Sequence, residues 1–346
     1  MDAFIVMPQA RRRLICEQAG NTLGLAPAGV EKDFWVCWTL RELFALPESG
    51  PHLTFKGGTS LSKGWKLIER FSEDIDIVID RDFLGFGGDQ SPERAPSNKQ
   101  LEKRLEDLKT ACQRYIRESL APRLAARLGN TLPRSAEWHL DNDADDSDAQ
   151  TLLFQYPVAV QRDSYIRPVV KIELGASSDT DPSANPEIQP YLAEALPGEL
   201  GESIFSVRTV APERTFWEKV SLLHEEGYRT GKEGPKARLA RHYYDLWCLI
   251  RAGIADRAVA DTGLFHRVVA HRTVFFRRNR VAQASLRQGS LRLLPADDRR
   301  TAWKQDYDAM REAMFFGESP DFDEILRIVG EFERRFNKMA AAPSSS

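Results

Sequence analysis

The apolar positions of this chain predict helices at both ends and short strands between them. Residues 8–46 have the spacing of two helices, with Leu14 and Ile15 on the apolar side of the first and aromatic residues along the second. Short β-branched and aromatic runs predict strands at residues 53–55, 74–80, 151–160 and 168–174. Helical spacing predicts further helices at residues 99–128, 213–226, 236–252, 256–272 and 301–336. This order indicates an α+β lobe followed by a mainly helical lobe.

Three segments without apolar periodicity separate these elements. Residues 81–98 are rich in Gly and Pro and predict a loop, and residues 133–150 carry five aspartates that are typical of a solvated loop. Residues 176–200, rich in Pro, Asp, Ser and Gly, are expected to connect the two lobes. The resulting division places one domain at residues 1–205, a helical domain at 206–340 and a disordered tail at 341–346.

Composition restricts the class of protein. A chain of 346 residues, 42% of them hydrophobic, has room for about two domains with sizeable cores. The net charge of −3 argues against general attraction to nucleic acid, so any RNA contact needs a local basic patch. The four cysteines are widely spaced and form no zinc or disulfide pattern. With no signal peptide and no apolar run of membrane-spanning length, a cytoplasmic location without membrane contact is expected.

A glycine pair followed by two aspartates carries the first chemical signal. The apolar run at residues 53–55 meets Gly57-Gly58, a segment compatible with a helix follows, and Asp74 and Asp76 then open an apolar strand. Carboxylates at positions i and i+2 of a strand point to the same face. That spacing suits Mg²⁺ bound together with nucleotide phosphates, which the backbone N–H groups of the glycine pair can approach.

Each half of this signal is weak alone, because a glycine pair often forms only a turn and acidic residues often alternate on surface strands. The order of strand, glycine pair, helix and Asp-x-Asp strand is more specific. It resembles the phosphate loop and metal-binding carboxylates of the nucleotidyltransferase fold. The P-loop pattern of many other nucleotide-binding proteins is absent.

A second alternating strand adds Lys171 and Glu173, which share one face opposite Val170, Ile172 and Leu174. Glu173 is a candidate third carboxylate for a two-metal site. The alternative is a surface Lys–Glu pair on an edge strand, and the pattern alone favours neither.

Two further candidates lie on predicted helices. Lys219, near the start of one helix, has the charge to contact a triphosphate, although a lysine in this position is more often solvated. Asp245 is surrounded by apolar residues on another helix. It can make a structural hydrogen bond, act as a base or pair with a lysine.

An arginine-rich segment covers residues 267–300, with Phe275 and Phe276 among the arginines. Arginine binds phosphates and aromatic rings stack on bases, so contact with RNA or DNA is one interpretation. A solvated basic face is the other.

Taken together, the motifs resemble those of the AbiEii/AbiGii toxin family of bacterial nucleotidyltransferases, found in type IV toxin–antitoxin and abortive-infection systems. The matching segments, in the order of the family, are Glu31-Lys32-Asp33-Phe34, Phe55 to Lys63, Arg70 to Asp76, Lys171-Ile172-Glu173, Arg214 to Lys219 and Arg241 to Asp245.

The resemblance implies an N-terminal nucleotidyltransferase lobe with a small mixed sheet, an NTP donor, and Mg²⁺ held by Asp74 and Asp76. It places the later lysine and aspartate of the family on Lys219, which would offset triphosphate charge, and on Asp245, which would orient Lys219 or assist deprotonation of the acceptor. Glu173 remains the candidate third carboxylate. The residues expected to bind the nucleotide are Gly57, Gly58, Ser60, Lys63, Ser72 and Lys171.

The family also implies partners. The acceptor would be an RNA, most simply the 3′ end of tRNA, where an added nucleotide would block aminoacylation. A separately encoded antitoxin of the transcriptional-regulator type would accompany the toxin. Two other interpretations stay open at this point: a nucleotidyltransferase that transfers AMP to a protein hydroxyl, and a regulatory module that binds NTP without turnover.

Overall fold

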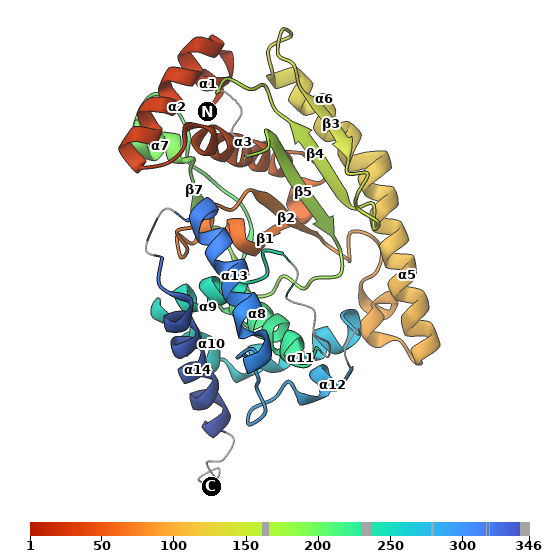
Figure 1. Ribbon diagram of the computed structural model, residues 1–346. Helices are drawn as coiled ribbons and strands as arrows, with labels where there is room; N and C mark the ends of the chain where they lie inside the picture. The colour runs from red at the N-terminus through yellow and green to blue at the C-terminus, as the bar shows by residue number, and fades with distance from the viewer. Residues whose placement is uncertain are drawn as a thin grey trace. The chain divides into compact units, whose positions relative to one another are not determined.

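The computed structural model describes residues 1–160, 166–229, 235, 237–277, 280–315, 317 and 319–339 (Figure 1). The chain divides into two compact units. The first comprises Met1–Trp65 and Phe71–Val210, and the second comprises Lys66–Arg70 and Ala211–Ser346. The short stretch Lys66–Arg70 therefore belongs to the second unit, although the first unit surrounds it in sequence.

A mixed sheet forms the centre of the first unit. Its seven described strands have the order β3 (His139–Asn142), β4 (Thr151–Gln155), β5 (Val169–Gly175), β2 (Asp74–Ile79), β1 (Leu53–Lys56), β9 (Thr209–Val210) and β6 (Ser183–Ala184). β2 runs antiparallel to β1 and parallel to β5. A separate pair joins β7 (Glu187–Ile188) to β8 (Phe205–Ser206).

Helices make up much of the rest of the first unit. They are α1 (Asp2–Val6), α2 (Gln9–Leu23), α3 (Pro27–Phe44), α4 (Gly57–Thr59), α5 (Asn98–Tyr115), α6 (Ala121–Thr131) and α7 (Tyr191–Ala195). Two π-helical segments, Ser60–Gly64 and Ile116–Leu120, follow α4 and α5, and Figure 1 shows α5 and α6 continuing in one direction beside β3 and β4. The indoles of Trp35 and Trp38 on α3 pack edge-on and tilted against Phe154 of β4. The core of this unit therefore lies between α3 and one face of the sheet.

The second unit is helical, as the periodicity predicts. Its helices are α8 (Pro212–Gly227), α9 (Arg241–Arg251), α10 (Ile254–Ala260), α11 (Thr262–Phe275), α12 (Arg280–Ser285), α13 (Asp297–Met314) and α14 (Phe322–Met339). Its core forms around Trp217, which contacts Phe265, Phe332 and Phe336. The mixed sheet and this helical unit confirm the expected α+β class.

Several local predictions are wrong. Residues 133–150 are not entirely loop, because β3 lies within them as a mostly exposed edge strand whose polar sequence hides the strand pattern. Residues 176–200 contain short elements as well as connections. The single helix expected at 301–336 is two helices, α13 and α14, separated by a segment with Gly317 and Pro320, and proline is excluded from helix interiors. Leu14 is 52% exposed rather than buried.

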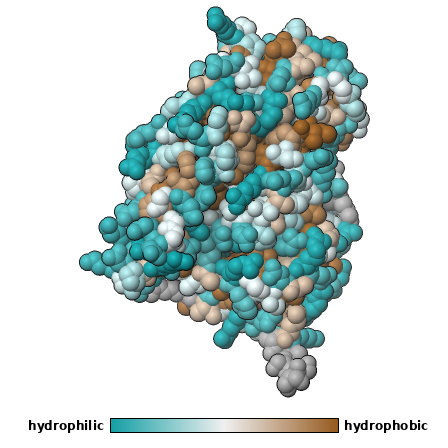
Figure 2. All heavy atoms as spheres, turned by 180° about the vertical axis from the view of Figure 1, so that it is seen from behind, coloured by the Kyte–Doolittle hydropathy of each residue, from teal (hydrophilic) through white to brown (hydrophobic). Residues whose placement is uncertain are grey.

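The surface shown in Figure 2 and the state of the cysteines agree with what the composition predicts. Figure 2 shows hydrophilic residues over most of the face it displays, with hydrophobic residues in smaller groups. All four cysteines are free. No helix in the described ranges combines the length and the apolar character that crossing a membrane requires.

Candidate active site

The predicted carboxylates meet on one face of the sheet. In the parallel pairing of β2 with β5, Asp74 lies opposite Lys171 and Asp76 opposite Glu173. The intervening side chains, among them Ile75 and Ile172, are fully buried on the other face. The side-chain period of two therefore places these four polar residues on the face opposite the α3 core, as the sequence alternation predicts.

Charge is concentrated at this face. Burial, followed by the carboxylate of Glu173, raises the pKa of Asp76 to about 7, while the Lys56 ammonium opposes this shift. Lys56 lies opposite Asp76 in the β1–β2 register. Lys171 Nζ lies 2.6 Å from Glu173 Oε1, in an ion pair that leaves both side chains partly exposed. The crowding of Asp74, Asp76 and Glu173 is the arrangement that a divalent cation relieves.

The donor set fits a metal held jointly with a nucleotide rather than by protein alone. Within the described residues, no three His, Cys, Asp or Glu side chains are placed to hold a metal ion. Asp74 and Asp76 would supply two oxygens, and Mg²⁺ commonly takes the rest of its ligands from substrate phosphates and water.

The glycine pair approaches these carboxylates closely. Gly57 has φ +80°, and a Cβ at this position would lie 1.9 Å from Asp76 Oδ2. The Ser60 hydroxyl donates to the Gly57 carbonyl over 2.8 Å, and the Thr59 hydroxyl donates to Ser72 Oγ over 2.8 Å. Gly57 therefore sets the gap between the loop and Asp76.

Substitution of Gly57 tests this close approach. We expect Gly57→Ala to lower turnover by roughly 10²-fold, because the loop or Asp76 must move by an ångström or more. Gly85→Ala is the matched control, since Gly85 also has positive φ, +88°, but nothing lies within 4 Å of its added Cβ. Steady-state kinetics of both variants make the comparison, and equal losses would refute a specific role for the Gly57–Asp76 gap.

The raised pKa of Asp76 also predicts that the stability of the protein depends on pH in metal-free buffer. Its pKa is about 7 in the folded chain against an ordinary 3.8, so folding takes up a proton between these values and stability falls as the pH rises through that window. Asp76→Asn removes this loss. We expect the variant to melt at a higher temperature than the parent at pH 8 and to lose this advantage at pH 4. Parallel melting profiles would contradict the assignment.

Lys63 lies in the same loop but faces the interior. Its ammonium is 2.8 Å from Asp33 Oδ1, and both side chains are 4% exposed. It also lies 3.4 Å from the centre of the Tyr191 ring. In the structure the Lys63 ammonium is therefore paired with Asp33, whereas the sequence predicts that Lys63 binds the nucleotide.

The second unit contains a buried cluster centred on Asp245. The Arg70 guanidinium binds both carboxylate oxygens, at 2.7 and 2.8 Å, and Lys219 Nζ donates to Oδ2 at 2.7 Å. Lys219 Nζ also lies 3.4 Å from His242 Nδ1. Of the alternatives for Asp245, the structure shows the lysine partner.

Electrostatics fix the charge states in this cluster. Burial opposes ionisation of Asp245, but Arg70 and Lys219 outweigh it and hold the pKa of Asp245 well below its usual range. Burial, and then the charges of Lys219 and Arg241, lower the pKa of His242 well below its ordinary value. Burial also lowers the pKa of Lys219 despite its carboxylate partner. Asp245 is therefore a fixed anion at neutral pH.

Three residues at these sites were not singled out from the sequence. Arg70 and Lys56 each lie within a recognised motif, where the sequence alone assigns them no role, and only tertiary packing shows that they face Asp245 and Asp76. The Thr59 hydroxyl lies 2.8 Å from Ser72 Oγ and 2.5 Å from the Asp74 carbonyl, so its one proton is shared between two acceptors. Its place directly after the glycine pair was the available signal.

The arginine-rich segment is less free than its composition indicates. Arg272 pairs with Glu225 at 2.6 Å, and Arg299 pairs with Glu226 while donating to backbone carbonyls. Arg267 and Arg300 pair with aspartates, and Arg292 lies over the Tyr228 ring. Arg272 and Arg299, whose side chains are mostly buried, therefore have a structural role within the second unit.

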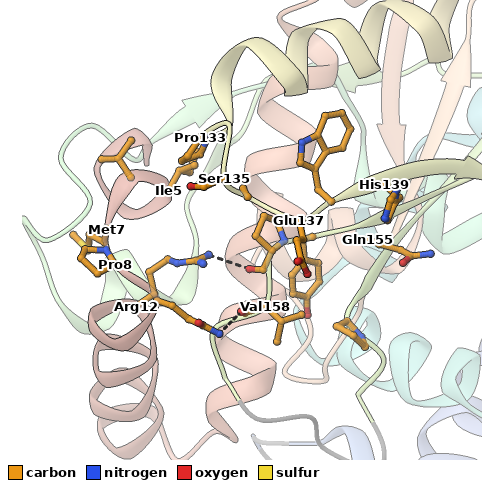
Figure 3. A pocket seen from close by; sticks show the side chains of 17 residues that line it. Ile5, Met7, Pro8, Arg12, Pro133, Ser135, Glu137, His139, Gln155 and Val158 are labelled. Atoms are coloured by element: carbon orange, nitrogen blue, oxygen red, sulfur yellow. Dashed lines mark hydrogen bonds between the residues drawn. The ribbon is translucent and has the colours of Figure 1, made fainter.

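A cavity of about 770 Å³ lies elsewhere in the first unit (Figure 3). It is lined by the α1–α2 junction, the segment before β3 and the residues after β4, including Arg12 and Trp138. None of the predicted site residues lines it, so its size does not identify it as the active site.

Of three comparisons with known proteins, the family match is the one that agrees with the motifs. Among solved structures, the nucleotidyltransferase toxin MenT4 of Mycobacterium tuberculosis H37Rv is similar, with a TM-score of 0.43 and 18% identity over 97% of this chain and 98% of that one. No curated protein matches the sequence. Residues 38–328 match the family described as nucleotidyl transferase AbiEii toxin of type IV toxin–antitoxin systems. Since this match covers most of the chain, the protein belongs to the AbiEii family of nucleotidyltransferase toxins.

Proposed function

We propose that this nucleotidyltransferase transfers NMP from an NTP to an acceptor hydroxyl at the carboxylate face of β2 and β5, with Mg²⁺ held by Asp74 and Asp76. The observation that carries the proposal is that Asp74, Asp76 and Glu173 lie on one face of the sheet and that the backbone of Gly57 lies beside Asp76. Bound Mg²⁺ would offset the negative charge of the phosphates.

Other residues of the site would balance charge, bind the triphosphate and support the glycine loop. Glu173 is the third carboxylate at this face, and its partner Lys171 balances its charge. The backbone around Gly57 and Gly58 would bind the triphosphate tail, while the Ser60 and Ser72 hydroxyls support the loop through their contacts with Gly57 and Thr59. The acceptor oxygen then bonds to the α-phosphorus as the bond to pyrophosphate breaks, and the proton of the acceptor hydroxyl passes to water.

In the second unit, we propose that Lys219 stabilises the buried Asp245 cluster, because it is 6% exposed and paired there, as Lys63 is with Asp33. Its orientation comes from Asp245, to which Lys219 is joined at 2.7 Å. A carboxylate whose pKa lies well below its usual range is a poor base, so orientation is the role we prefer over deprotonation of the acceptor. Arg70 completes this arrangement by holding the other side of Asp245.

The acceptor we propose is the 3′-terminal hydroxyl of tRNA, and the support is membership of a toxin family. A nucleotide added there would prevent aminoacylation, which is a direct route to growth arrest. A type IV toxin also has an antitoxin partner, which we propose to be a transcriptional regulator.

The acceptor is tested with total tRNA, Mg²⁺ and each α-labelled NTP in turn, beside the same tRNA oxidised by periodate to destroy the terminal diol. We expect label in intact tRNA and none in oxidised tRNA. Equal labelling of both would place the acceptor elsewhere in the RNA. Label found only in protease-sensitive material would contradict an RNA acceptor and support protein modification.

A further inference from the structure

The first turns of α3 bury three consecutive charged residues, Glu31, Lys32 and Asp33. Their exposed fractions are 2%, 3% and 4%. Burial of a charge costs several kcal/mol unless partners compensate it. Adjacent helical positions point about 100° apart, so each of the three reaches a different part of the first unit.

Lys32 holds the segment that leads into the catalytic strand. Its ammonium forms an ion pair with Glu73, the residue between Ser72 and Asp74. The same ammonium donates to the Arg167 carbonyl at 3.0 Å, two residues before β5. One buried cation thus contacts the segments preceding both strands that carry the site carboxylates.

Asp33 holds the segment that follows the glycine pair. One carboxylate oxygen pairs with Lys63 in the turn that follows Gly57 and Gly58, and the other accepts from the Tyr191 backbone N–H at 2.6 Å. Burial raises the pKa of Asp33, while Lys63 opposes that shift.

Glu31 completes the set. Its carboxylate accepts the backbone N–H groups of Ala159 and Val160 at 2.7 and 3.1 Å. The three side chains therefore tie this turn of α3 to the glycine loop, to the start of β2 and to the chain before β5.

We propose that Lys32 and Asp33 are positioning residues, which hold the glycine loop and the Asp74–Asp76 strand at the separation that nucleotidyl transfer requires. The gap they control is the narrow one between Gly57 and Asp76, where a single methyl group has no room. The consequence for turnover rests on the proposed function, whereas the effect on loop order does not.

The test separates positioning from stability. Replacing a buried ion pair with apolar residues is often neutral for stability, so Lys32→Met combined with Glu73→Leu should melt near the parent temperature. We expect backbone amide exchange to accelerate in peptides covering residues 70–76, and turnover to fall about 10- to 100-fold. For the glycine loop, Asp33→Asn combined with Lys63→Met should accelerate backbone amide exchange in residues 57–64.

Two variants serve as controls. Glu73→Gln keeps an acceptor for Lys32 but removes its counter-charge, so it should lower the melting temperature while retaining turnover within about threefold of the parent. Glu42→Gln alters a carboxylate on the same helix that is 2% exposed and pairs with Arg127 at 2.6 Å, away from both loops. It should leave exchange in both peptides, and turnover, unchanged.

Parental exchange and turnover in the Lys32→Met, Glu73→Leu protein would overturn the proposal, as would equal losses in Glu42→Gln. If the parent itself transfers no nucleotide, the proposed function fails, but accelerated exchange in the two loops would still support the positioning contacts.

Discussion

Replacing Asp74 with alanine is expected to abolish nucleotidyl transfer while leaving the fold intact. Asp74 and Asp76 are the two carboxylates assigned to Mg²⁺, and the side chain of Asp74 is only partly buried, so its loss leaves no large cavity. Loss of metal-dependent charge stabilisation should lower turnover by at least roughly 10³-fold, equivalent to about 4 kcal/mol in the transition state. Initial rates with labelled NTP, together with the melting temperature, give both quantities.

Asp80 offers a matched control for this variant. It follows directly after β2, at the end away from Asp74, and its carboxylate accepts only a local backbone N–H from Asp82, at 2.9 Å, among the described contacts. Asp80→Asn should keep parental activity. A folded Asp74→Ala protein that transfers nucleotide at the parental rate would remove Asp74 from the mechanism.

The largest effect on stability is expected from Asp245→Ala in the second unit. The change leaves the Arg70 guanidinium and the Lys219 ammonium buried without their shared anion. Removing one partner of a buried ion pair typically costs about 3–5 kcal/mol, whereas breaking an exposed pair costs about 1 kcal/mol or less. Urea-induced unfolding of the variant measures the loss.

Asp256→Ala is the control, because Asp256 forms an exposed pair with Arg335 and its side chain is 65% exposed. The low pKa of Asp245 also sets a direction with pH. A depressed folded pKa contributes stability above the ordinary pKa of aspartate, and this contribution is lost as the pH falls through the folded value. If Asp245→Ala and Asp256→Ala destabilise the protein equally, the buried cluster is not the support that the structure indicates.

The sequence predicted those features that follow from periodicity. The alternation in residues 169–175 correctly assigned Lys171 and Glu173 to one face, because the side-chain period of a strand does not depend on its neighbours. The exposed edge strand β3 was missed, since three of its four residues are polar and no apolar alternation marks it. The division between α13 and α14 was missed although Pro320 marks it.

Tertiary pairing accounts for what the sequence could not provide. That Asp76 lies opposite Glu173 depends on the register between β2 and β5, which are far apart in the chain. The ion pairs of Arg70 with Asp245 and of Lys63 with Asp33 likewise join distant segments. From the sequence alone, a charged residue of a motif can be interpreted as solvated or as catalytic, because its ion-pair partner is not known.

The most direct test of the central claim compares NTP labelled on the α-phosphate with NTP labelled on the γ-phosphate, using the parent protein, Mg²⁺ and tRNA. Nucleotidyl transfer predicts that α-label enters the acceptor and that γ-label is released as pyrophosphate. Entry of γ-label into the acceptor would show phosphoryl transfer and contradict the account, as would the absence of any α-label in the acceptor.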